Sequence, residues 1–190
     1  MDNFRPLKNC LENKTILLTG SGSGIGRTAA VTLAKYGAQL VLISKDLHKL
    51  ESLHEEIVSQ GLKEPLIHSM DFENAEEEEY QQIKVAIKDR FERLDGLINN
   101  AGISMRALFI DLDLKAFDKV MKVNFYGTIY CTKHALPHLL KNKGSVVGVS
   151  SIAGHKGLPA RTAYSASKFA MTGFLESLRI ENLKKGLHVL

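Results

Sequence analysis

The chain has 190 residues, of which 44% are hydrophobic and 24% are charged, and its formal net charge is +4. This length predicts one domain with a hydrophobic core of its own, and the composition excludes a collagen, a disordered tail and a disulfide-stabilised miniprotein. Because the 25 basic residues are scattered among 21 acidic ones, their small excess predicts a solvated mixed surface and no nucleic-acid partner.

Short apolar runs rich in β-branched residues alternate with longer amphipathic segments. The runs predict strands at Thr15–Thr19, Gln39–Ser44, Pro65–Ser69, Gly96–Asn99, Ser145–Val149 and Leu187–Leu190. The segments between them predict helices at Gly24–Tyr36, Leu47–Gln60, Asn74–Phe91, Asp113–Leu140 and Thr162–Lys184. Because strands and helices alternate, the sequence predicts an α/β fold with a doubly wound, Rossmann-like parallel sheet.

A glycine-rich turn joins the first predicted strand to the first predicted helix. Backbone N–H groups at such a helix N-terminus attract a pyrophosphate, and glycine permits the turn and the close approach of the phosphate. The spacing G-x-x-x-G-x-G therefore predicts a dinucleotide-binding loop rather than a turn without a ligand. Its residues are Gly20, Ser21, Gly22, Ser23, Gly24, Ile25 and Gly26.

The end of the second predicted strand bears on the choice of cofactor. An acidic residue there would bind the ribose 2′-hydroxyl of NAD, but the chain has Ser44 followed by Lys45, a cation that suits the 2′-phosphate of NADP. Asp46 leaves an alternative open, because it could sit at the ribose or cap the next helix. We therefore expect NADP(H) as the preferred cofactor, with NAD(H) as the alternative.

Two later helices carry features that bear on their boundaries. Asn74, followed by the acidic run from Glu76 to Glu79, predicts an N-cap with acidic residues on the helix dipole, and this run needs no metal. Pro137 lies inside the predicted helix Asp113–Leu140, so we expect this helix to kink or to end early.

Tyr164 and Lys168 are one helical turn apart, so they share one face of the last predicted helix. A nearby ammonium favours the phenolate of a tyrosine, which lets it exchange protons near neutral pH. Ser151 follows the fifth predicted strand and Gly102 follows the fourth. Both therefore fall at the carboxyl-end rim where a doubly wound sheet binds ligands, together with the glycine-rich turn.

The ordered combination of these motifs resembles the short-chain dehydrogenase/reductase family, in its shorter, single-domain branch. The resemblance runs from about Thr15 to Leu190. The residues that carry it are Thr19-Gly20-x-x-x-Gly24-x-Gly26, Asn99-Asn100-Ala101-Gly102, Asn124, Ser151 and Tyr164-x-x-x-Lys168.

The resemblance implies four catalytic residues. Tyr164 is the general acid/base at the carbonyl or alcohol oxygen, and Lys168 favours its ionised form and holds the nicotinamide ribose. Ser151, rather than Ser150, hydrogen-bonds the substrate oxygen, and Asn124 anchors a water in a proton relay.

The resemblance also extends the cofactor site and implies an oligomer. Asp71 matches a position that touches the adenine, although helix capping is an alternative role for it. Further cofactor-lining residues are Asn100, Ala101 and Gly102. A homodimer or homotetramer is expected, with the helices at 113–140 and 162–184 packed against a second subunit.

The chain stops inside an apolar run, which leaves one edge of the predicted sheet without a cover. We therefore expect a piece of a longer protein. Residues 1–14 would be an N-terminal extension, and residues 15–190 a single dinucleotide-binding and catalytic domain. By the resemblance, the missing part would hold the C-terminal strands and the substrate loop.

Cys10 and Cys131 match no redox or metal-ligand spacing, and His134 and His138 have no third ligand nearby, so we expect reduced thiols and no metal. The N-terminal residues Met1–Pro6 lack the apolar core of a signal peptide, and no apolar run approaches the roughly 20 residues of a membrane span. We therefore expect a cytoplasmic protein without a membrane span.

The expected function is an oxidoreductase that transfers a hydride between NADP(H) and a small-molecule carbonyl or alcohol. The alternative is a non-catalytic NADP-binding sensor or scaffold of the same fold. The complete set of four catalytic residues argues against that alternative. The substrate itself cannot be read from the sequence.

Overall fold

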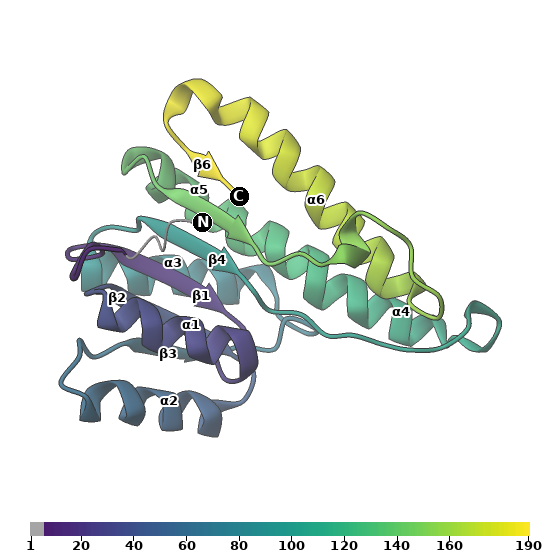
Figure 1. Cartoon of the computed structure of the whole chain (residues 1–190), viewed down its shortest axis with the longest axis horizontal. Coiled ribbons are helices and arrows are strands. Elements are labelled where there is room, and N and C mark those ends of the chain that lie inside the picture. Colours follow the sequence, from purple (N-terminus) through teal and green to yellow (C-terminus); the bar gives the residue numbers. More distant parts are fainter. Residues whose placement is uncertain (1–5) are drawn as a thin grey trace.

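The computed structural model describes residues 6–190, and in this range it contains one six-stranded parallel sheet with the strand order β3-β2-β1-β4-β5-β6 (Figure 1). The predicted doubly wound α/β fold is therefore confirmed. The strands are β1 (Thr15–Thr19), β2 (Gln39–Ser44), β3 (Leu66–Ser69), β4 (Gly96–Asn99), β5 (Ser145–Gly148) and β6 (His188–Val189). The helices are α1 (Gly24–Lys35), α2 (Leu47–Ser59), α3 (Glu77–Phe91), α4 (Leu114–Met121), α5 (Gly127–Lys141) and α6 (Thr162–Asn182).

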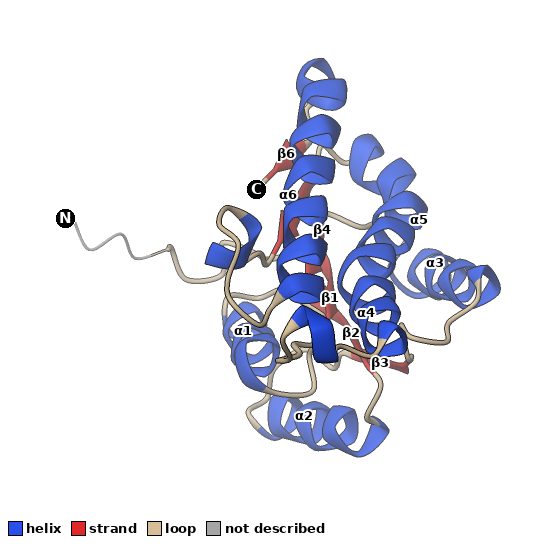
Figure 2. Ribbon diagram, turned by 90° about the vertical axis from the view of Figure 1, so that its right-hand side faces the viewer, coloured by secondary structure: helices blue, strands red, loops and turns tan. Residues whose placement is uncertain are grey.

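Helices cover the sheet on both faces, and each face has its own core (Figure 2). Ile16 and Leu18 of β1 point toward α1 and α2, whereas Leu17 between them points toward α3, α5 and α6. Successive side chains of a strand alternate between faces, so a strand buried on both sides is a continuous apolar run. This is why the sequence located the strands to within one residue at each end.

The N-terminal segment packs against the edge of the α1/α2 core. Leu11 contacts this core, and its N–H donates to the carbonyl of Tyr36. Residues 1–5 of the expected extension, and with them most of the segment in which we sought a signal peptide, lie outside the described residues. Cys10 is exposed and Cys131 is buried, and both are free thiols.

The start of α3 differs from the expectation. The helix begins at Glu77, and Glu79 accepts a hydrogen bond from the N–H of Glu76 at 3.0 Å. Asn74 is therefore not the cap, and that prediction is wrong. The physical reason is the carboxylate of Asp71, which accepts hydrogen bonds from the Nδ2 of Asn74 at 3.3 Å and from the N–H of Glu73 at 3.2 Å, so it holds residues 71–74 in a turn.

The long helix predicted at 113–140 is divided, but not by its proline. A five-residue π-helical turn, Lys122–Tyr126, separates α4 from α5. Pro137 lies inside α5, which continues to Lys141, so the expectation that it ends the helix early is wrong. Such π turns interrupt α-helices frequently at functional sites.

Strands β1 and β4 lie side by side, and a buried carboxylate joins their amino ends. Asp95, which is 8% exposed, accepts hydrogen bonds from the N–H of Thr15 at 3.0 Å, from Lys14 at 3.2 Å and from Arg93 at 2.8 Å. Burial alone would raise the pKa of Asp95, but the hydrogen bonds from Arg93, Thr15 and Lys14 outweigh it and hold this pKa below its usual value.

We expect Asp95→Asn to lower the free energy of unfolding by about 2 kcal/mol at pH 7, because the buried N–H of Thr15 and the half-exposed Lys14 and Arg93 lose a charged acceptor. A carboxyl with a depressed folded-state pKa stabilises the fold above its unfolded-state pKa of about 3.9 and loses this effect as the pH falls through the folded value. The difference between the variant and the native chain should therefore shrink below about pH 4. Urea denaturation at several pH values measures it, with Asp111→Asn at an exposed position as the control. A difference that stays constant down to pH 2 would contradict this role.

Candidate active site

The glycine-rich turn approaches two neighbouring loops too closely for side chains. A Cβ at Gly20 would lie 2.7 Å from the Cα of Ala101, and Gly20 has φ of +67°. A Cβ at Gly22 would lie 2.7 Å from the Oγ of Ser44, and one at Gly26 would collide with the carbonyl oxygen of Gly20. The turn is therefore a bare backbone surface, and this is the form that a phosphate can approach.

Hydrogen bonds fix this turn to the end of β4. The Oγ1 of Thr19 accepts from the N–H groups of Asn100 at 3.1 Å and Ala101 at 3.0 Å. In return, the Nδ2 of Asn100 donates to the carbonyls of Thr19 at 3.0 Å and Gly20 at 3.1 Å. Ser21, one of the predicted cofactor contacts, is fully buried, and its hydroxyl donates to the carbonyl of Ile43 at 3.1 Å. Its side chain thus joins the turn to β2.

A cavity of about 370 Å³ opens at the carboxyl ends of the strands, where the chain order reverses between β1 and β4. It brings together the glycine-rich turn, the ends of β2, β4 and β5, and α6. Its lining residues are Gly20, Ser23, Ile25, Ser44, Asn100, Ala101, Gly102, Ile103, Ser104, Val149, Ser150, Tyr164 and Lys168. The predicted site residues that do not line this cavity are Ser21, Gly22, Gly24, Gly26, Lys45, Asp71, Asn124 and Ser151.

Tyr164 and Lys168 reach the cavity from the first two turns of α6, as their spacing predicted. Lys168 is 4% exposed, and its Nζ donates to the carbonyl of Val149 at 2.7 Å. Burial lowers the pKa of Lys168, because a buried ammonium loses its hydration. A Cβ at Gly102 would lie 3.7 Å from this Nζ, so the loop after β4 lies close to the ammonium, and both residues line the cavity.

Asn124 lies fully buried in the π turn and holds the cavity wall from behind. Its Oδ1 accepts from the N–H of Ile103 at 2.8 Å, and its Nδ2 donates to the carbonyl of Ile103 at 3.0 Å and to the Oγ of Ser167 at 3.0 Å. Ser167 in turn donates to the carbonyl of Tyr164 at 2.8 Å. Sequence reasoning missed Ser167, although its position three residues after Tyr164 places it near that tyrosine on the helix.

The two serines after β5 have different partners. Ser150 lines the cavity, and its Oγ lies 3.3 Å from the Oγ1 of Thr172. Ser151 does not line it, and its Oγ accepts from the N–H of Ala153 at 3.2 Å. A hydroxyl that accepts one hydrogen bond can still donate its own hydrogen, so Ser151 keeps a donor for a ligand oxygen.

Two lysines near the end of β2, Lys45 and Lys49, each form an ion pair with an aspartate. The Oδ1 of Asp46 accepts from the N–H of Lys49 at 3.2 Å, and its Oδ2 lies 3.1 Å from the Nζ of Lys49. Asp46 thus caps α2, and the hydrogen bond from the Lys49 N–H lowers the pKa of Asp46 most. The Nζ of Lys45 lies 3.5 Å from the Oδ2 of Asp71.

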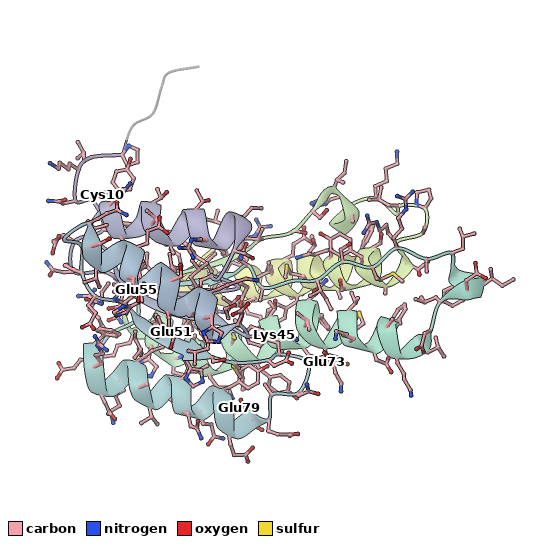
Figure 3. All side chains as sticks on the ribbon, turned by 90° about the horizontal axis from the view of Figure 1, so that it is seen from below. Cys10, Lys45, Glu51, Glu55, Glu73 and Glu79 are labelled. Atoms are coloured by element: carbon pink, nitrogen blue, oxygen red, sulfur yellow. The ribbon has the colours of Figure 1, made fainter. Side chains whose placement is uncertain are left out.

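Figure 3 labels Lys45 together with acidic residues from several elements: Glu51 and Glu55 on α2, Glu73 before α3 and Glu79 on α3. Glu73 is not a free charge, because its carboxylate lies 2.5 Å from the Nζ of Lys119. No group of three His, Cys, Asp or Glu side chains within residues 6–190 is arranged to hold a metal ion. In that same range, every helix is too short or too polar to cross a membrane.

Residues 14–190 match the family model described as short chain dehydrogenase. The human protein named dehydrogenase/reductase SDR family member 7 is 36% identical over 173 residues, which cover 90% of this chain and 51% of that protein. An 11-beta-hydroxysteroid dehydrogenase of Pinus massoniana is 36% identical over 172 residues, covering 90% of this chain and 48% of that protein. The chain therefore spans about half the length of these curated relatives.

Solved structures resemble the whole described fold. A putative short chain dehydrogenase from Pseudomonas syringae superimposes with a TM-score of 0.95 at 33% identity, covering 100% of this chain and 79% of that one. A putative short chain dehydrogenase from Escherichia coli CFT073, complexed with NADPH, gives a TM-score of 0.92 at 35% identity, covering 97% and 77% of the two chains.

We expect Gly20→Ala and Gly24→Ala to separate crowding from backbone strain at this turn. Both glycines have positive φ, but a Cβ at Gly24 meets no atom within 4 Å, whereas one at Gly20 meets Ala101 and Asn100. Gly24→Ala should cost about 1 kcal/mol of stability from strain alone, and Gly20→Ala about 2–4 kcal/mol, because overpacking adds to the strain. Urea denaturation measures both, and equal losses would refute the close packing.

Proposed function

Because this chain belongs to the short-chain dehydrogenase family, we propose that it is an oxidoreductase that uses NADP(H) to interconvert a carbonyl and an alcohol. The observation that carries the proposal is one shared cavity. Tyr164 and Lys168 of α6 line the same 370 Å³ cavity as Gly20 and Ser23 of the glycine-rich turn. A proton-transferring pair beside a dinucleotide cradle is the arrangement that this chemistry requires.

Two features of the cavity support a nicotinamide dinucleotide as its ligand. Gly20 and Gly22 pack too closely against Ala101 and Ser44 for a side chain, so the turn presents backbone at these positions, and the exposed Ser23 leads into α1. Lys168 offers a buried ammonium that the ribose hydroxyls can approach. The NADPH complex of the Escherichia coli relative supports this assignment. When bound, the cofactor supplies or accepts the hydride at the reacting carbon.

The chain's own part is to bind the substrate oxygen and to move its proton. In the direction of reduction, the hydroxyl of Tyr164 donates its proton to the carbonyl oxygen as the alcohol forms, and in oxidation the phenolate takes it back. Lys168 holds the nicotinamide ribose through its ammonium. Ser151 donates a hydrogen bond to the same substrate oxygen.

Asn124 has a positioning role in this proposal. Its two hydrogen bonds to Ile103 hold the cavity wall, and its bond to Ser167 connects that wall to the backbone at Tyr164. A relay water anchored by Asn124 would pass the proton on to solvent. Asp71, which organises the turn before α3, lies close to Lys45 and would face the adenosine half of the cofactor.

The alternative is a protein of the same fold that binds NADP without turnover, as a sensor or scaffold. It has no use for an ordered Tyr164, Lys168, Ser151 and Asn124, and their joint presence favours the enzyme. Oxidation of NADPH by the purified protein with a panel of ketones, aldehydes and steroids distinguishes the two. Binding without oxidation across the panel would favour the sensor.

Other parts of the proposal follow from the family and the sequence. We propose that residues 15–190 act as one dinucleotide-binding and catalytic unit on a small-molecule substrate in the cytoplasm. We also propose a homodimer or homotetramer through the segment 113–140 and α6, whose exposed apolar side chains include Tyr126, Tyr130 and Phe169. We propose that the chain prefers NADP(H), with NAD(H) as the alternative cofactor.

We expect Tyr164→Phe to lower turnover by at least about 100-fold, because it removes the proton donor and little volume. The dissociation constant for NADPH should change by less than about threefold, since the phenol hydroxyl acts on the substrate. Tyr36→Phe, at the end of α1, is the matched control. Lys168→Ala should weaken both turnover and NADPH binding. Full activity of Tyr164→Phe would refute the proposed mechanism.

We expect Lys45→Ala to weaken NADP binding by about 10-fold to 100-fold and to leave NAD binding unchanged, because a charge-assisted contact to phosphate contributes about 1.5–3 kcal/mol. Ser44→Asp with Lys45→Ala should favour NAD, since an acid repels the 2′-phosphate and accepts from a free 2′-hydroxyl. Titration with both cofactors measures the change. Tighter binding of NAD than of NADP by the native chain would contradict the cofactor assignment.

A further inference from the structure

A second lysine, on α2, lies against the glycine-rich turn. A Cβ placed at Gly22 would lie 3.2 Å from the Cβ of Lys49 and 2.7 Å from the Oγ of Ser44. The aliphatic stem of Lys49 therefore begins beside the glycine-rich turn, at the point of Gly22 that Ser44 of β2 also approaches. Lys49 itself does not line the cavity, which Ser44 does. Lys45 and Lys49 thus reach the surroundings of Ser44 from two elements, β2's end and α2.

The side chains of Lys45 and Lys49 are more exposed than that of the neighbouring Arg27, which is 29% exposed. Arg27 of α1 is engaged by Glu56, at 3.1 Å and 2.6 Å, and by the carbonyl of Lys49 at 3.3 Å. Lys45 and Lys49 keep side chains that are 64% and 57% exposed. Each is held by one carboxylate, Lys45 by Asp71 and Lys49 by Asp46.

Such exposed ion pairs are weak, because water and salt screen them. A phosphate ester with close to two negative charges at this point would attract both ammonium groups more strongly than a single carboxylate does. The carboxylate of Asp46 would then compete with the phosphate for Lys49. Its other oxygen stays bound to the N–H of Lys49, so Asp46 remains at the cap.

We propose that Lys49 is a second specificity-determining residue for the 2′-phosphate of NADP, and that Asp46 weakens this contact by holding the same ammonium. The inference rests on the proposed function, since it concerns the same cofactor. The sequence left open whether Asp46 selects NAD by binding the ribose. In this proposal Asp46 instead limits the affinity for NADP, because it holds the ammonium of Lys49 from the N-cap of α2.

Binding titrations with NADP⁺, NAD⁺, 2′,5′-ADP and 5′-AMP test the proposal without any turnover. We expect Lys49→Gln to weaken NADP⁺ and 2′,5′-ADP by about 5-fold to 30-fold and to leave NAD⁺ and 5′-AMP within twofold. Lys49→Arg keeps the charge and should keep the selectivity. Lys35→Gln, at the end of α1, changes the net charge equally and should leave all four ligands unaffected.

Asp46→Ser should change the affinity for NADP⁺ in the opposite direction from Lys49→Gln, because serine keeps the N-cap of α2 and removes the competing charge. It should tighten NADP⁺ and 2′,5′-ADP by about 3-fold to 10-fold. In the double variant Asp46→Ser with Lys49→Gln, this gain should disappear, because the effect of Asp46 acts through Lys49. Circular dichroism verifies that each variant is folded.

The outcomes separate this inference from the proposed function. If the native chain binds NADP⁺ but Lys49→Gln leaves the ratio of NADP⁺ to NAD⁺ affinity unchanged, the role of Lys49 is wrong and the proposed function stands. A gain from Asp46→Ser that persists in the double variant overturns the coupling. A native chain that binds none of the four ligands overturns the proposed function and this inference together.

Discussion

The site depends on the way in which β1 and β4 are tied together. At their amino ends the carboxylate of Asp95 joins them, and at their carboxyl ends four hydrogen bonds connect Thr19 and Gly20 to Asn100 and Ala101. These two strands come from distant parts of the chain and lie where the strand order reverses. Because both ends are fixed, the glycine-rich turn and the wall after β4 face each other across a constant gap, and the cavity lies in that gap.

A second set of hydrogen bonds carries this constraint to α6. Asn124 clamps both backbone groups of Ile103, and Ser167 passes the connection to the carbonyl of Tyr164. Arg161, just before α6, adds hydrogen bonds to Ser104 and to the carbonyl of Met105. The wall after β4 and the start of α6 are thus one hydrogen-bonded unit, so Tyr164 takes its place from residues far away in the sequence.

Local sequence patterns predicted most of the fold and several of the residues that line the cavity, but not the hydrogen-bond partners of their side chains. Strands buried on both faces are continuous apolar runs, and the glycine-rich turn has a spacing that few other structures need. The start of α3 was misjudged because Asp71 captures Asn74, and the π turn around Asn124 has no signal in a helical periodicity. Both depend on contacts that form only after folding.

The buried ammonium of Lys168 lowers the stability of the folded chain. Within residues 6–190 no carboxylate forms an ion pair with it, and its hydrogen bond goes to the neutral carbonyl of Val149. Removing a charge from water without an opposite charge disfavours folding. The chain therefore gives up part of its thermodynamic stability to hold this group in the cavity, and selection for stability alone would replace it by an apolar side chain. The lysine at this position therefore has no explanation in folding stability, and its explanation lies in the role proposed for it in the cavity.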